Sequence, residues 1–118
     1  MQQKQLLTIL KKSTEALSQL LGPKLQRIVL YGSRARGDFT LDSDVDILIM
    51  TNISQKETQK YRKRISKIFT SLSLEHDIIL SFALVDEDSY NFWLQAIPFY
   101  QNVEKEGIIL YDKNKYKL

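Results

Sequence analysis

Cysteine is absent from this 118-residue sequence, and glycine, proline and histidine occur only four times, twice and once. Without cysteine the chain forms no disulfide, no thiolate metal site and no cysteine nucleophile. A single histidine cannot build a histidine metal cluster. Long polar or glycine-rich tracts, which would mark a linker, are also lacking. We therefore expect a single folded domain spanning residues 1–118.

Long hydrophobic runs are missing as well. No apolar stretch approaches the roughly 20 residues that a membrane-spanning helix requires. Residues 1–10 are too polar for a secretory signal, so we expect a cytoplasmic protein without membrane contact. A strong charge of either sign is also absent, because 17 Lys and Arg against 14 Asp and Glu leave a net charge of +3. This mild excess suits an anionic ligand.

The hydrophobic pattern predicts helices that alternate with strands. Helices are expected at 5–21, at 54–72 and from about 86 to 97, with a restart at Pro98. Strands are expected at 26–31, 44–50, 77–85 and 108–111. Gly107 suits the left-handed position that often follows a helix. The order predicts an α/β (α+β) fold, a small mixed sheet with helices packed on it.

The stretch from residue 30 to 50 carries most of the chemistry. Gly32 and Ser33 end one apolar run, and Asp44 and Asp46 begin the next. Residues two apart in a strand point to the same face, so both carboxylates should face one spot beside the glycine turn. Two like charges this close are costly unless a cation lies between them. A divalent cation held by oxygens and by phosphates satisfies this requirement.

The glycine turn is the candidate phosphate site. Gly32 has no Cβ, so a phosphate can approach the backbone there, and Ser33 offers a hydroxyl and an N–H. Arg34 and Arg36 are the candidate positive contacts. Their directions alternate, so we expect one of them to face the ligand and the other to face solvent, and the sequence does not decide which.

Three pieces of this stretch form a recognisable pattern: Gly32-Ser33, the segment 34–37, and Ser43 followed by Asp44 and Asp46. The pattern resembles the signature of the nucleotidyltransferase superfamily related to DNA polymerase beta, and within it the minimal nucleotidyltransferases (MNT). The close match covers residues 28–50. The resemblance implies the nucleotidyltransferase fold and a nucleoside triphosphate, ATP in the first place, with Mg²⁺. It also implies transfer of a nucleoside monophosphate to an acceptor with release of pyrophosphate.

The resemblance further implies a third carboxylate, on the strand that follows the long helix. Asp77 is the candidate, and with Asp44 and Asp46 it would bind metal and take part in catalysis. Ser81 or Ile79 is the other candidate for the position nearest the two acids. In that case the third ligand is missing and turnover suffers.

Two functions from different classes remain open at this point. The first is an enzyme whose acceptor is presented by a second protein or a second copy, because the chain is short for an acceptor-binding domain. The second is a catalytically weak nucleotide-binding or partner-binding module, since minimal nucleotidyltransferases resemble the antitoxin in toxin–antitoxin pairs with a helical HEPN-type protein.

A basic run within 56–67 suggests nucleic acid at first sight. We interpret it instead as the solvated side of an amphipathic helix. We therefore do not expect nucleic acid as a partner.

Overall fold

The computed structural model describes residues 3–40 and 42–116. Its helices are α1 (Gln3–Leu21), α2 (Ser33–Arg36), α3 (Gln55–His76), α4 (Glu87–Trp93) and α5 (Pro98–Glu106), with short 3₁₀ turns at Gly22–Lys24 and Lys113–Tyr116. Its strands are β1 (Leu25–Tyr31), β2 (Val45–Thr51), β3 (Leu80–Asp86) and β4 (Ile108–Asp112). No helix among these described residues is long and apolar enough to cross a membrane.

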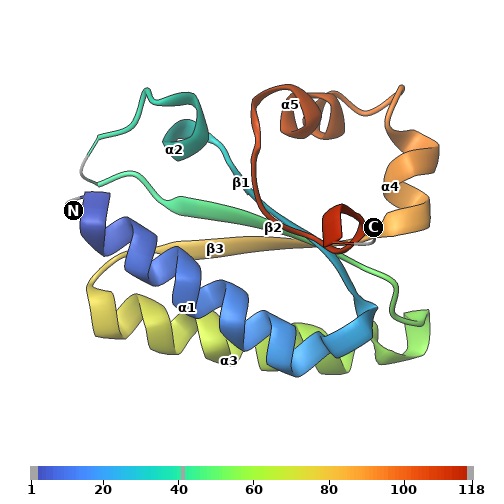
Figure 1. The fold of residues 1–118 in the computed structure, drawn as a ribbon, viewed down its shortest axis with the longest axis horizontal. Coiled ribbons are helices and arrows are strands. Elements are labelled where there is room, and N and C mark those ends of the chain that lie inside the picture. Colours follow the sequence, from blue (N-terminus) through green and yellow to red (C-terminus); the bar gives the residue numbers. More distant parts are fainter. Residues whose placement is uncertain (1–2, 41, 117–118) are drawn as a thin grey trace.

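The four strands form one mixed sheet, as the sequence predicts, in the order β3-β2-β1-β4. Strand β1 is antiparallel to both β2 and β4, whereas β2 and β3 are parallel. Parallel neighbours need a crossover connection, and α3 supplies it. Figure 1 shows β1 and β2 at the centre of the molecule, and each of these two strands has a neighbouring strand on both sides.

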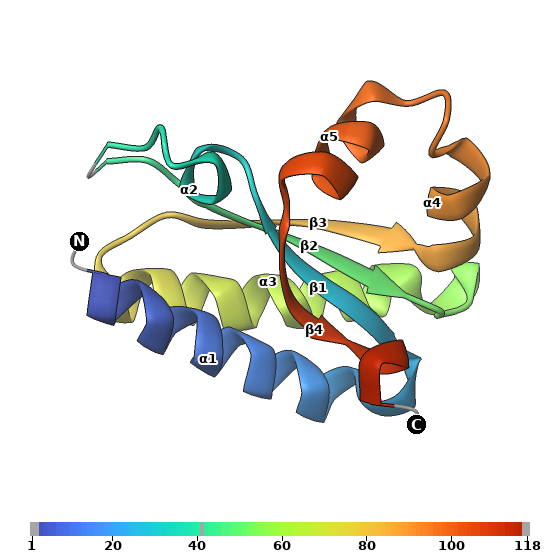
Figure 2. The same cartoon turned by 45° about the horizontal axis from the view of Figure 1, so that its top comes forward.

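Helices cover the sheet on two sides (Figures 1 and 2). Helices α1 and α3 lie side by side on one face, and α2, α4 and α5 lie on the other. Strand β2 divides its side chains between them by alternation: Ile47 and Ile49 pack toward α1 and α3, whereas Leu48 and Met50 pack with Tyr90 and Val103 of the α4–α5 layer. Asp46 shares the face of Leu48. The acidic pair therefore belongs to the side that carries α2 and α5.

The basic run lies on the exposed side of α3. Four residues on the opposite side of this helix are buried, namely Tyr61, Ile65, Phe69 and Leu72. The basic residues of 56–67 are exposed. Since α3 covers the face opposite Asp46, these charges do not surround the acidic pair.

Three expected boundaries are wrong. Helix α3 continues four residues past 72, to His76, and β3 begins at Leu80 rather than at 77. Ser73 accounts for this ending, because its carbonyl accepts the Ile78 N–H and its hydroxyl accepts the Leu80 N–H. The expected helix from 86 to 97 ends early, at Trp93, and α5 begins at Pro98.

Gly107 is needed for a reason other than the expected one. Its φ is −67° and its ψ is 149°, so it is extended and not left-handed. A Cβ at this position would lie 2.5 Å from Val29 Cγ1 and 2.5 Å from the Val103 carbonyl oxygen. The missing side chain thus lets the end of α5 pack directly on β1.

Substituting Gly107 with alanine tests this contact. Overpacking of a well-filled core usually costs about 1–3 kcal/mol, and we expect Gly107→Ala to lower the unfolding free energy by that amount in urea titration. Lys105→Ala, on the same helix and exposed, is the control and should stay close to the original chain. Equal stability of both variants would show that Val29 moves aside at no cost.

Candidate active site

The Asp46 carboxylate lies directly against the backbone of Gly32. Asp46 pairs with Tyr31 across the antiparallel β1–β2 ladder, and Gly32 is the next residue along the chain. A Cβ on Gly32 would lie 2.6 Å from Asp46 Oδ2. The glycine also has φ 78° and ψ −158°, a conformation that is essentially limited to glycine. The Asp46 carboxylate therefore fills the space that a side chain at position 32 would need.

The two acids differ in exposure and in electrostatics. Asp44 is exposed and Asp46 is half-buried. Burial raises the pKa of Asp46 above its ordinary value, and the charge of Asp44 raises it further. A cation placed between them would act in the opposite direction. A bound cation would therefore stabilise the ionised forms of Asp44 and Asp46.

Arg34 holds the segment that leads into the acids. Its guanidinium is buried, Nη2 donates to the Ser43 carbonyl at 3.1 Å, and the ring of Phe39 lies 4.6 Å from its central carbon. Ser43 in turn closes a tight turn, since its hydroxyl accepts the Thr40 N–H at 2.9 Å. Arg34 therefore positions Ser43 and the residue after it, Asp44.

Arg36 is the arginine on the open side. Its Nε lies 3.3 Å from Asp38 Oδ2 and its Nη1 lies 3.6 Å from Glu106 Oε2. It also lines a cavity together with Gly32. Ser33, half-buried, begins the single turn of α2 directly after that glycine. The structure thus brings Gly32, Ser33 and Arg36 together at the end of β1.

Asp77 is not on the strand where we expected it. It follows α3 in a left-handed conformation, with φ 52°, and lines a small cavity with Asp42 and Ser43. In the parallel β2–β3 ladder the residue paired with Asp46 is Ser81. No group of three or more His, Cys, Asp or Glu able to hold a metal occurs among the described residues.

The two acids nevertheless fit a magnesium ion in their donor chemistry. Mg²⁺ prefers hard oxygen ligands, keeps several waters, and is usually held by one or two carboxylates together with substrate phosphates. Asp46 at the start of β2 and Asp44 directly before the strand supply two such carboxylates. Ser81, the residue paired with Asp46 on β3, offers a hydroxyl and not a third carboxylate.

Sequence comparison identifies the family. Residues 10–109 match the nucleotidyltransferase domain family. Two proteins of Methanocaldococcus jannaschii, both named as candidate protein adenylyltransferases, are similar in sequence. The first is 39% identical over 77 residues, covering 65% of this chain and 76% of the relative. The second is 29% identical over 102 residues, covering 86% and 94%. The chain belongs to the nucleotidyltransferase family and is a nucleotidyltransferase enzyme.

Solved structures agree on the fold. A candidate nucleotidyltransferase from Sulfolobus solfataricus superposes with a TM-score of 0.62 at 20% identity, over 95% of this chain and 87% of that one. A toxin–antitoxin structure with AMP-PNP gives a TM-score of 0.53 at 23% identity, over 87% and 73%. The four-stranded mixed sheet with its covering helices is therefore the nucleotidyltransferase fold.

A double-mutant cycle measures how tightly the glycine and the acid share their space. We expect Gly32→Ala to destabilise the protein by about 1–3 kcal/mol, from backbone strain and from the contact with Asp46. In an Asp46→Ala background the loss should be smaller by at least about 0.5 kcal/mol, since neighbouring sites couple by 0.5–3 kcal/mol. Chemical denaturation of the four proteins gives the coupling energy between the two positions. A coupling energy of zero would show that a side chain at position 32 makes no steric contact with Asp46.

Proposed function

We propose that this enzyme transfers a nucleoside monophosphate from a nucleoside triphosphate, ATP in the first place, to a hydroxyl on a protein acceptor, with Mg²⁺. The observation that carries the proposal is the position of the Asp46 carboxylate against Gly32, with Asp44 just before β2 and near enough for its charge to act on Asp46. Such an arrangement offers metal ligands and an approachable backbone at one place. The names of the two archaeal relatives support a protein acceptor.

The reaction forms a bond between the acceptor oxygen and the α-phosphorus, and it breaks the bond from that phosphorus to the oxygen bridging the β-phosphate. Pyrophosphate leaves, and the hydroxyl proton passes to solvent. A bound Mg²⁺, held by Asp44 and Asp46, supplies charge neutralisation for the triphosphate and the leaving pyrophosphate. The chain's own part is positioning, which phosphoryl transfer needs more than a protein nucleophile.

Each candidate residue takes a separate part in this proposal. Gly32 and Ser33 receive the phosphates at the turn, and Arg36 contacts them from the open side. Arg34 is a positioning residue, because its guanidinium fixes the carbonyl of Ser43, the residue directly before Asp44. Ser81, rather than Asp77, is the neighbour of Asp46 in the sheet, so we propose a site with two protein carboxylates and no third.

Calorimetric titration of ATP tests the metal site. We expect binding that requires magnesium and that Asp46→Asn weakens by at least about 10- to 100-fold, the loss seen when even an outer partner of a metal ligand is removed. Asp88→Asn makes the same chemical change on the exposed side of α4 and should bind as the original chain does. Unchanged affinity in Asp46→Asn would rule out the metal assignment.

A second function is favoured by one surface feature. Phe92 and Trp93 stack edge to face at 5.0 Å and remain 76% and 50% exposed at the end of α4. An aromatic pair left in solvent suits a protein partner. We propose a helical HEPN-type protein as that partner, in line with the toxin–antitoxin pairs among the structural neighbours. The enzyme would then act as an antitoxin by modifying the protein it binds.

A catalytic antitoxin and a pure binder differ in one measurable way. If catalysis neutralises the partner, a variant carrying Asp44→Asn and Asp46→Asn should still bind the proposed HEPN-type protein in a pull-down assay. The same variant should no longer protect cells that express that protein. Full protection by the double variant would instead assign the neutralisation to binding alone.

A further inference from the structure

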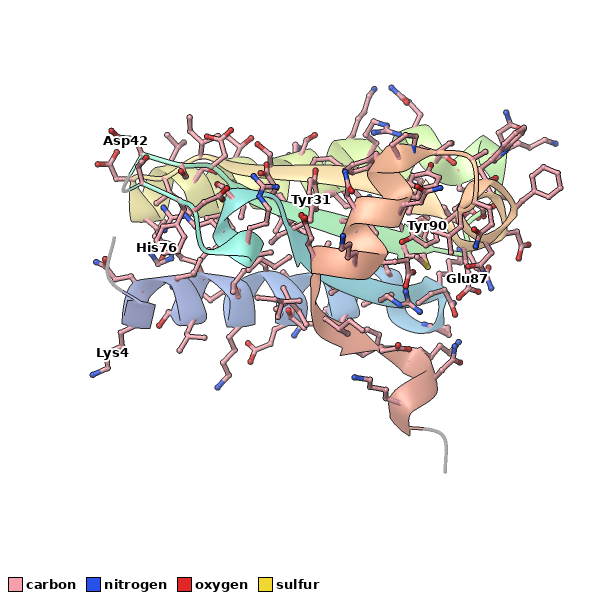
Figure 3. The ribbon with its side chains drawn as sticks, turned by 90° about the horizontal axis from the view of Figure 1, so that it is seen from above. Lys4, Tyr31, Asp42, His76, Glu87 and Tyr90 are labelled. Atoms are coloured by element: carbon pink, nitrogen blue, oxygen red, sulfur yellow. The ribbon has the colours of Figure 1, made fainter. Side chains whose placement is uncertain are left out.

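Only Gly32 and Arg36, of the residues that line a cavity beside the acidic pair, have a part in the function described so far. It measures about 230 Å³ and lies between the end of β1 and α5. Its walls include Tyr31, Gly32, Arg36, Phe99, Asn102 and Glu106. Figure 3 shows Tyr31 between the α2 turn and α5, on the side of the sheet that carries the acids. The cavity therefore begins where the glycine turn ends.

The sheet register ties this cavity to Asp46. Tyr31 and Asp46 are directly paired across β1 and β2, and paired residues in an antiparallel ladder point to the same face. A ligand whose phosphates lie at Gly32 and Asp46 therefore lies next to this cavity, since Gly32 also lines it.

The size and the walls restrict what fits. Pockets that enclose a whole drug-sized ligand measure about 300–1,000 Å³, so this one takes a single ring system and not an entire nucleotide. Tyr31 and Phe99 form an aromatic wall, with ring centres 5.2 Å apart in an edge-to-face arrangement. The amide of Asn102, one turn further along α5, brings a donor and an acceptor to the same opening.

We propose that this cavity receives the nucleobase of the triphosphate, with Phe99 as the stacking surface and Asn102 as the residue that reads the base. The inference rests on the proposed nucleotidyl transfer and adds the specificity of the same site. Adenine presents a donor at N6 beside an acceptor at N7, which an asparagine amide matches, whereas guanine presents two acceptors at this edge. The cavity is therefore one for adenine.

Two side chains with matched controls test the proposal. Removing an aromatic stacking surface costs about 1–3 kcal/mol per base, so Phe99→Ala should weaken magnesium-dependent ATP binding by roughly 5- to 150-fold. Binding of magnesium tripolyphosphate, which has no base, should change less than about twofold. Leu74→Ala removes a large exposed apolar side chain from α3, outside the cavity, and should leave both ligands unaffected.

Asn102 controls the choice of base in this proposal. A good bidentate amide contact gives about 1–3 kcal/mol of discrimination, or roughly 5- to 150-fold in favour of ATP over GTP. Asn102→Ala should bring the two affinities together and leave tripolyphosphate binding unchanged, while Asn91→Ala on α4 should preserve the preference.

The tripolyphosphate measurement separates failure of this inference from failure of the proposed function. If the protein binds tripolyphosphate and ATP but Phe99→Ala and Asn102→Ala change neither affinity nor preference, the base lies elsewhere and this inference is wrong. If the protein binds neither ligand with magnesium, the proposed function fails and the base cavity fails with it. Loss of tripolyphosphate binding in Phe99→Ala would also contradict the inference, since it would assign Phe99 to the phosphate site.

Discussion

The contact between the Asp46 carboxylate and the Gly32 backbone is the constraint on which the site depends. It exists because β1 and β2 pair antiparallel in a register that sets Tyr31 opposite Asp46. A shift of that register by one residue would turn Asp46 toward α1 and α3 and bring an apolar side chain to the turn. Correct strand pairing and correct placement of the acid are therefore the same event in folding.

The division of the sheet into two faces explains how a small chain keeps a core and a site. The face toward α1 and α3 holds the larger apolar cluster. The other face is only partly covered, by α4 and α5, and its smaller cluster centres on Leu48, Tyr90 and Val103. The stability of the fold comes mainly from the first face, which leaves the ends of β1 and β2 on the second face available for charged groups.

Much of this arrangement could be predicted from the sequence. The alternation of apolar residues gave the order of helices and strands, and the spacing of Asp44 and Asp46 placed both on one strand face. The start of β3 could not be found this way, because Ser73 ends α3 through hydrogen bonds to Ile78 and Leu80 that depend on the folded chain. The start of β3 decides whether Asp77 or Ser81 lies beside Asp46. The sequence therefore left both residues open as neighbours of the acidic pair.

Other parts of the site depend on contacts between distant residues and carry no local signal. Periodicity cannot tell that Arg34 turns inward while Arg36 turns outward, since this is decided by the Ser43 carbonyl and the Phe39 ring. Phe99 and Asn102 lie more than sixty residues from the glycine turn in the chain and meet it only through the packing of α5. Gly32 and Arg36 were indicated by the motif, and Tyr31, which directly precedes Gly32, is a further cavity residue that its position in the motif could have indicated.

The buried arginine has a consequence for how the enzyme meets its substrate. The described residues between α2 and β2, 37–40 and 42–44, form neither helix nor strand, and irregular backbone of this kind would sample many conformations if nothing held it. The bond from Arg34 to Ser43 fixes the end that carries Asp44. The conformational entropy of that end is therefore lost when the chain folds. Nucleotide binding then does not have to order it, which is the general advantage of a preorganised site.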